Sequence, residues 1–131
     1  MIAVDTSVWI AYLRRGDATL QQAMNALLDE DRVSLPAIVR LELAAGTSPR
    51  HSPRLLKLLG GVHAIETLAE DWRRAEQLAL AGAQVGERFG AADLLIVASV
   101  GRLGHRLWTH DSDFARMEKL GWCRVWIPGS A

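Results

Sequence analysis

The sequence has one cysteine, no excess of either charge and no long apolar segment. Cys123 alone cannot form an intrachain disulfide or a thiolate metal site, so we expect a reducing compartment. No run reaches about 18 consecutive apolar residues, and residues 1–5 lack the pattern of a signal peptide. We therefore expect a soluble, cytoplasmic protein with no membrane span.

The charges balance, because 15 Lys and Arg residues stand against 15 Asp and Glu residues. Without net charge the chain has no long-range field to attract nucleic acid, which argues against a dedicated DNA-binding module. The balance still permits an enzyme whose metal ions supply positive charge. Thirteen of the 15 cations are Arg, whose planar guanidinium suits bidentate phosphate contacts.

The 131 residues are half apolar, which is enough to bury a core, and we expect a single domain over residues 1–131. Short apolar runs predict strands at residues 2–4, 33–35, 62–67, 106–109 and 124–127. Helical spacing and chain breakers predict helices at about residues 6–15, 18–28, 36–46, 55–59, 69–85, 91–100 and 114–120. Strands that alternate with helices indicate an α/β fold with a mostly parallel central sheet.

Three tryptophans fall within apolar patterns, and we expect Trp9, Trp72 and Trp108 in the core. On the long helix, Trp72 would share one side with Ala79. The helix after it is apolar almost all round, so we expect that helix to be buried.

Acidic residues occur where the predicted strands and helices meet. Asp5 and Asp111 lie just after predicted strands, Glu42 and Asp93 lie on predicted helices, and Asp113 is close behind Asp111. In a parallel sheet with right-handed crossovers the strands end along one edge, and ligands bind there. We therefore expect the acids to converge. Two carboxylates about 4 Å apart repel by roughly 4 kcal/mol at an effective dielectric of about 20, so such a cluster requires a cation.

Each acid taken alone also has a structural interpretation. Asp5 could cap the first helix, and Asp93 could interact with a helix dipole. Glu42 could pair with Arg40 or lie partly exposed. The remaining acids could be turn and cap residues. Capping preferences do not explain why all of them should converge, so the pattern favours a shared site.

Converging carboxylates suit hard divalent cations such as Mg²⁺ or Mn²⁺. Two such ions about 3.5–4 Å apart can activate a water and stabilise the leaving oxygen of a phosphodiester. The hydroxyls of Thr6, Ser7 and Thr109 could orient waters or carboxylates, although Thr6 could equally support the helix start. Candidate phosphate-contacting cations, with solvated surface charge as the alternative, are Arg14, Arg15, Arg50, Arg54 and Lys57.

Four segments occur in a characteristic order: IAVDTSVWI at residues 2–10, VRLEL at 39–43, FGAADLLI at 89–96 and THDSDF at 109–114. Together they resemble the PIN-domain ribonucleases, and specifically the VapC-type toxins of bacterial and archaeal toxin–antitoxin pairs. The resemblance implies a PIN-like α/β/α sandwich and metal-dependent endonucleolytic cleavage of RNA. It also implies a homodimer and inhibition by a small antitoxin whose C-terminal part occupies the active-site groove. The acidic quartet that it implies is Asp5, Glu42, Asp93 and Asp111, with Asp113 as an extra acid.

The sequence thus predicts an endoribonuclease toxin that uses Mg²⁺ or Mn²⁺, forms no covalent intermediate and is neutralised by a cognate antitoxin. An aspartyl-phosphate phosphatase is one alternative, but it needs a second Asp two residues after the first, where this chain has Ser7. A catalytically silent module that binds RNA or a protein is the other alternative. It would have the same fold and would release no product.

Overall fold

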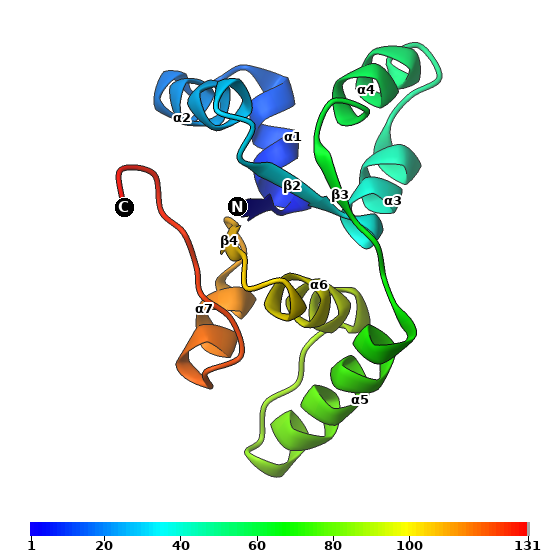
Figure 1. Ribbon diagram of the computed structural model, residues 1–131, viewed down its shortest axis with the longest axis vertical. Coiled ribbons are helices and arrows are strands. Elements are labelled where there is room, and N and C mark those ends of the chain that lie inside the picture. The colour runs from blue at the N-terminus through cyan, green and yellow to red at the C-terminus, as the bar shows by residue number, and fades with distance from the viewer. Residues whose placement is uncertain (131) are drawn as a thin grey trace.

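The computed structural model describes residues 1–130 and contains a four-stranded parallel sheet (Figure 1). The strand order is β3-β2-β1-β4, with β1 (Ile2–Val4), β2 (Val33–Pro36), β3 (His63–Ile65) and β4 (Arg106–Trp108). All three pairings are parallel, with Ala3 opposite Ser34 on one side and Leu107 on the other. The predicted parallel sheet is therefore confirmed.

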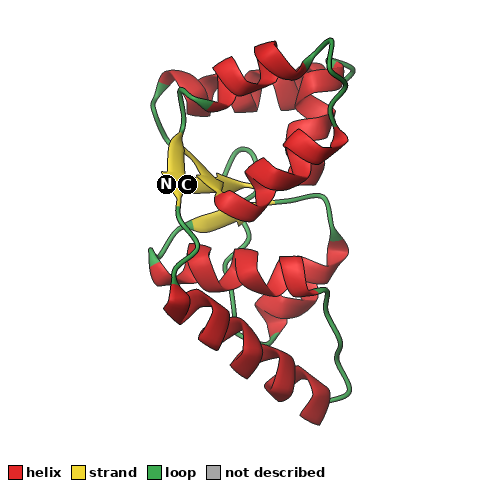
Figure 2. Cartoon of the chain, turned by 90° about the vertical axis from the view of Figure 1, so that its right-hand side faces the viewer, coloured by secondary structure: helices red, strands yellow, loops and turns green. Residues whose placement is uncertain are grey.

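Helices cover both faces of this sheet, which lies between them in Figure 2. One layer contains α1 (Thr6–Arg14), α2 (Ala18–Asp29), α3 (Ala37–Gly46) and α4 (Ser52–Leu59). The other layer contains α5 (Ala69–Gln84), α6 (Ala91–Arg102) and α7 (Ser112–Lys119). The α/β/α sandwich is thereby confirmed. Within residues 1–130, no helix is long and apolar enough to cross a membrane.

The core forms where the sheet meets the helices. β1 and the consecutive α6 residues Leu94 to Val100 are fully buried, because α6 packs between the sheet and α5. A helix that is apolar all round has to be buried in this way. Trp9 and Trp108 are also in the core, as predicted.

The prediction for Trp72 is wrong, since 60% of this side chain is exposed. The side of α5 that faces the core carries Asp71, Ala75, Leu78 and Gly82, which are spaced three or four residues apart. Trp72 is one residue past Asp71 and therefore about 100° round the helix from that stripe. Ala79 is exposed for the same reason.

The strand predicted at residues 124–127 is also wrong, because only an isolated parallel bridge between Leu107 and Val125 forms there. Leu107 N donates to Arg124 O, and Trp126 N donates to Leu107 O. Val125 N donates instead to the Glu118 carboxylate. The segment thus pairs with β4 around one residue only.

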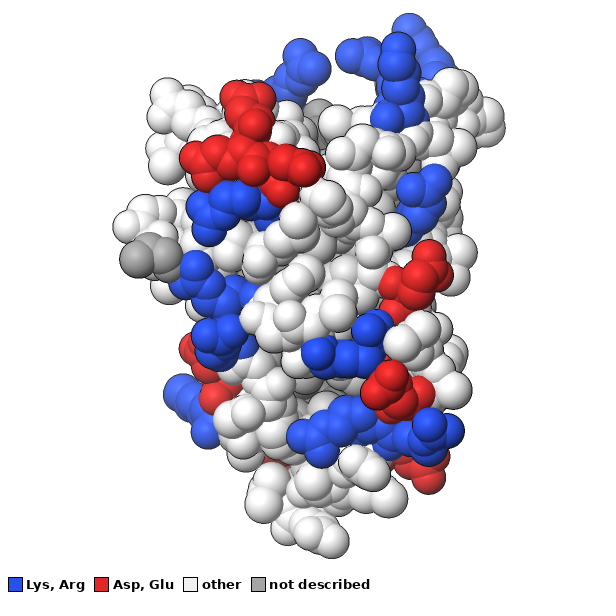
Figure 3. Space-filling model, viewed as in Figure 1, with Lys and Arg blue, Asp and Glu red and all other residues white. Residues whose placement is uncertain are grey.

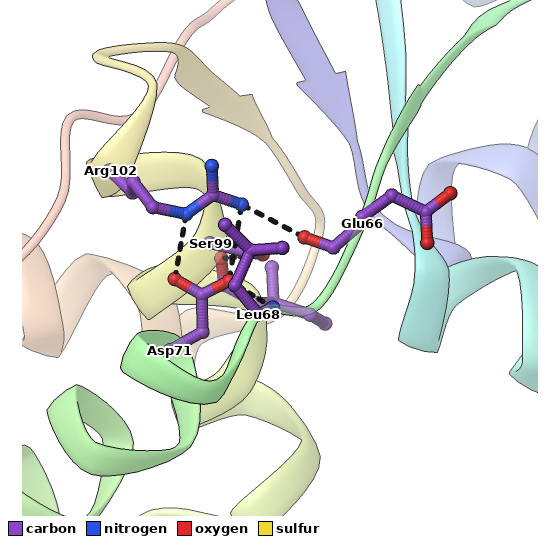
Figure 4. A network of polar contacts seen from close by, with 6 residues as sticks. Glu66, Leu68, Asp71, Ser99 and Arg102 are labelled. Carbon is purple, nitrogen blue, oxygen red and sulfur yellow. Dashed lines mark hydrogen bonds and ion pairs between the residues drawn. The ribbon is translucent and has the colours of Figure 1, made fainter.

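An ion pair with a buried carboxylate joins the start of α5 to the end of α6 (Figure 4). Arg102 Nε donates to Asp71 Oδ1 at 2.9 Å and its Nη2 donates to Asp71 Oδ2 at 3.1 Å. Nη2 also donates to the Glu66 carbonyl, and Leu68 N donates to Asp71 Oδ2 at 2.8 Å. Asp71 is 1% exposed, so its charge is removed from water and is compensated by the Arg102 guanidinium and a backbone N–H.

Candidate active site

Asp5 lies directly after β1, at the carboxyl edge of the sheet, and is 5% exposed. Although Asp5 precedes α1, its side chain makes no capping hydrogen bond to that helix. Instead, Asp5 Oδ2 accepts hydrogen bonds from Ser7 Oγ and Thr109 Oγ1, each at 2.9 Å. The carboxylate is therefore held by two hydroxyls from opposite ends of the chain, and the capping interpretation does not apply.

The same hydroxyls fix the loop that follows β4. His110 N donates to Ser7 Oγ at 3.0 Å, and Asp111 N donates to Thr109 Oγ1 at 3.0 Å. Each hydroxyl thus donates to Asp5 and accepts from the backbone near Asp111. This arrangement fixes the direction of each O–H bond and ties Asp5 to the segment that carries the later acids.

Glu42 lies on α3 and is exposed, which agrees with the exposed alternative rather than with a pairing to Arg40. Its Oε1 accepts a hydrogen bond from Thr6 Oγ1 at 2.9 Å, across 36 residues of sequence. Each of the three hydroxyls singled out from the sequence therefore donates to a predicted site carboxylate.

Three further acids meet at the ends of α6 and α7. Carboxylate oxygens of Asp93, Asp111 and Asp113 all lie within 4.8 Å of one another, which is close enough for a shared metal ion. Asp93 is the third residue of α6. Asp111 is the N-cap of α7 and accepts from Asp113 N at 2.9 Å, so it both caps a helix and joins the cluster. Asp5 and Glu42 lie outside this tight group.

The charges of the other four acids nevertheless all act on Asp93. The pKa of Asp93 is raised from 3.8 to about 6, first because burial disfavours the charged form. The negative charges that raise the pKa further belong to Asp111, Asp5, Asp113 and Glu42. Three of the predicted acids therefore meet in one group, and Asp5 and Glu42 act on it through their charges.

Little positive charge offsets this cluster. Within residues 1–130, the one ion pair to these acids joins Arg116 Nη1 to Asp113 Oδ1 at 2.7 Å. Elsewhere the charges are mixed, and on the face drawn in Figure 3 basic and acidic side chains are interspersed. The sequence reasoning did not select Arg116. Its spacing of three residues after Asp113 on a helix was the available signal.

An open groove of about 1240 Å³ runs between α1 and α2 on one side and α3 and α4 on the other. Of the five predicted site acids, Glu42 is in its lining, whereas Asp5, Asp93, Asp111 and Asp113 are not. Of the five predicted phosphate-contacting cations, Arg14, Arg15 and Arg54 line it. Arg50 and Lys57 are exposed but are not part of this lining. His51, which the sequence reasoning missed, is also in the groove wall.

Comparison with known proteins identifies relatives of this chain. The sequence profile of the PIN domain matches residues 2–120. Ribonuclease VapC32 of Mycobacterium tuberculosis is 38% identical over 114 residues, which are 85% of each chain.

Solved structures show the same fold at lower sequence identity. VapBC2 from Rickettsia felis, bound to a DNA fragment from its promoter, aligns with a TM-score of 0.80 at 17% identity and covers 96% of this chain and 98% of its own. A toxin–antitoxin complex from Klebsiella pneumoniae aligns with a TM-score of 0.76 at 20% identity over the full length of both chains.

Proposed function

The chain belongs to the PIN-domain family, and from this premise we propose that it is a VapC-type endoribonuclease, a toxin that hydrolyses RNA phosphodiester bonds with Mg²⁺ or Mn²⁺. The observation that carries the proposal is the meeting of Asp93, Asp111 and Asp113, whose carboxylate oxygens lie within 4.8 Å of one another. Burial and the charges of four neighbouring acids raise the pKa of Asp93 to about 6 at the same place. Like charges that are gathered in this way repel one another, and perturbed groups of this kind concentrate at functional sites. The 38% identity to a ribonuclease supports the same activity.

The residues fit a divalent metal ion. Carboxylate oxygens are the hard donors that Mg²⁺ and Mn²⁺ prefer, and three of them lie within 4.8 Å of one another. We assign Asp93, Asp111 and Asp113 as metal-holding residues, together with Asp5 and Glu42 at the border of the cluster. When bound, the metal would lower the pKa of a water and neutralise the charge that develops on the phosphate.

The chain's own hydroxyl groups hold two of the carboxylates in fixed orientations. Ser7 and Thr109 donate to the same oxygen of Asp5, and Thr6 donates to Glu42. These hydroxyls therefore act as orienting partners, because a ligand with a fixed carboxylate plane binds a cation with less loss of entropy. No side chain serves as a nucleophile in this proposal.

The groove supplies a path for the RNA strand to the acids. Arg14 and Arg15 from the end of α1 and Arg54 from α4 line its two sides, and Glu42 is the predicted site acid in its wall. Arginines in this position would contact phosphates and set the register of the strand without reading its sequence. Arg50 and Lys57 lie outside the groove lining, so they would attract the RNA strand more weakly than the three arginines that line the groove.

We extend the proposal to a cognate antitoxin as the protein partner. Structural neighbours include a toxin–antitoxin complex, and the groove is large enough to admit a peptide segment that would exclude RNA. We also propose that residues 1–131 act as one PIN domain and that two copies form a homodimer. The exposed side chains of Trp72 and Leu80 on α5 are apolar surface of the kind that a second copy would cover. An RNA substrate and the single Cys123 agree with a cytoplasmic location.

The direct test is cleavage of end-labelled RNA by the purified protein with and without metal. We expect internal cleavage in Mg²⁺ or Mn²⁺, none in excess EDTA, and none by the folded Asp93→Asn variant with metal. Cleavage that continues in excess EDTA would refute the proposed chemistry. RNA that is bound but never cleaved in either metal would favour the silent binding module instead.

A further inference from the structure

Arg116 is a charged side chain beside the acid cluster whose contacts the proposed function leaves unused. Its Nη1 donates to Asp113 Oδ1 at 2.7 Å, while Nε and Nη2 both donate to Glu87 Oε2. The guanidinium also lies over the ring of Phe89, with its central carbon 4.5 Å from the ring centroid. One side chain on α7 thus contacts an acid of its own helix and two residues of the loop before α6.

That loop is itself fixed against α5. Glu87 N donates to Gly82 O at 2.9 Å, and a Cβ atom at Gly82 would lie only 2.8 Å from Glu87 O. The ring of Phe89 packs edge-on against Trp122, with centroids 5.6 Å apart. The loop then enters α6, where Asp93 is the third residue. Arg116 therefore connects the segment that positions Asp93 to the helix that carries Asp113.

These ion pairs are too exposed to add much stability. The Arg116, Glu87 and Asp113 side chains are 40%, 35% and 38% exposed, and pairs of this kind contribute little to folding. Their effect is on geometry, because a planar guanidinium that is held on three sides has one orientation. Asp113 Oδ1 is engaged by Arg116, whereas Asp113 Oδ2 accepts no hydrogen bond from the residues described, 1–130.

We propose that Arg116 is a positioning residue for the metal site. It sets the orientation of Asp113 and holds α7 against the loop before α6, so that Asp93, Asp111 and Asp113 present oxygens to one cation. This inference rests on the proposed function, since it concerns the affinity of the same acids for a divalent ion.

A purely electrostatic role and a positioning role for Arg116 predict opposite changes in the affinity for a cation, so the direction of the change tests the proposal. Removal of the Arg116 charge leaves the cluster more negative, so a purely electrostatic role would make a cation bind more tightly. A positioning role makes the cation bind more weakly, because Asp113 and α7 lose their fixed placement. Residues that orient metal ligands typically change metal affinity 10- to 100-fold.

The experiment is calorimetric titration of the metal-free, full-length protein with Mn²⁺, without RNA, for the wild type and three variants. We expect Arg116→Gln to weaken Mn²⁺ binding by about tenfold or more. Arg116→Lys keeps the charge but cannot contact both acids and the ring, so it should also weaken binding. The matched control is Arg32→Gln, which removes an exposed ion pair with Glu30. Arg32 precedes β2 and so lies at the amino end of the strands, away from the acids at their carboxyl ends. This variant should bind Mn²⁺ like the wild type.

The outcomes separate the two proposals. A folded Arg116→Gln variant that binds Mn²⁺ as tightly as the wild type, or more tightly, overturns the positioning role and leaves the metal site intact. If circular dichroism shows that Arg116→Gln does not fold, Arg116→Lys decides, and unchanged affinity in that variant overturns the role. A wild-type protein that binds no Mn²⁺ removes the proposed metal site itself.

Discussion

Asp71 and Asp93 occupy the same position, the third residue of a helix, in α5 and α6, but their surroundings differ. Asp71 is 1% exposed and accepts hydrogen bonds from Nε and Nη2 of the Arg102 guanidinium and from Leu68 N. Within residues 1–130, Asp93 accepts no hydrogen bond, and its neighbours are four other acids that raise its pKa. The chain thus compensates the buried charge of Asp71 where it joins two helices, and leaves the half-buried Asp93 without a compensating partner at the carboxyl edge of the sheet. An uncompensated charge of this kind is what a cation site requires.

The largest effect is expected from removal of the uncompensated charge. Asp93→Asn keeps the size of the side chain but removes a metal-holding carboxylate, so RNA cleavage in Mg²⁺ should fall by at least about 100-fold. Initial rates on end-labelled RNA measure this, with circular dichroism as the check on folding. A folded variant that retains more than a tenth of wild-type activity would show that Asp93 is dispensable.

Removal of the compensated charge, that of Asp71, should lower the free energy of unfolding. Asp71→Ala leaves Arg102 without its partner and removes the acceptor for Leu68 N, so the free energy of unfolding should fall by about 2–4 kcal/mol. Urea denaturation measures this loss. The matched control is Asp31→Asn, which removes the charge of the exposed pair with His63, keeps a residue type that tolerates the positive φ at this position, and should change stability by less than about 1 kcal/mol. Equal losses in the two variants would remove the distinction between the buried pair and a surface pair.

Asp93 should cost stability in the metal-free protein, and the cost should depend on pH. Its pKa is about 6 in the folded state against 3.8 for an unperturbed side chain, so the fold favours the protonated form. The favourable contribution is fully present below pH 3.8 and is lost as pH rises through about 6. In EDTA, Asp93→Asn should therefore melt at the same temperature as the wild type near pH 4 and a few degrees higher near pH 7.5. Thermal unfolding at both pH values measures this, and a variant less stable at pH 7.5 would contradict it.

The groove cations should have the smallest effect, because each contributes one phosphate contact. Arg54→Gln should weaken RNA binding in EDTA by about threefold and make binding less sensitive to salt. Lys57→Gln is the control on the same helix, outside the groove lining, and should change binding less. Fluorescence anisotropy with labelled RNA at two salt concentrations distinguishes the two variants. If Lys57→Gln lost more RNA affinity than Arg54→Gln, the RNA strand would have to bind outside this groove.

The convergence of the acids could be predicted from sequence because it depends on strand ends. Asp5 and Asp111 follow apolar runs, and the parallel topology brings such positions to one edge whatever the side-chain details. The alternation of strands and helices gave the layered fold for a similar reason. Both inferences depend on the periodicity of apolar residues and on the order of elements along the chain, and neither requires knowledge of side-chain packing.

The predictions that are wrong concern residues whose burial or pairing differs from what their apolar residue type suggests. Periodicity assigned Trp72 to the buried side of α5 because Trp is apolar, but the buried stripe includes the charged Asp71, which only its Arg102 partner makes possible. Residues 124–127 are apolar enough for a strand, yet Trp126 is buried through an edge-on contact with Trp108, 5.0 Å between centroids, and pairing stops after one bridge. The contacts of Arg116 with Glu87 and Phe89 likewise depend on tertiary packing.

The measurement that tests the central claim most directly is a calorimetric comparison of metal-free wild type and Asp93→Asn, each titrated with Mn²⁺ at pH 7.5. If the uncompensated charge at Asp93 exists to hold a cation, the wild type should bind Mn²⁺ and the Asn variant should bind it at least about tenfold more weakly. Equal Mn²⁺ affinity in the two folded proteins would contradict the account.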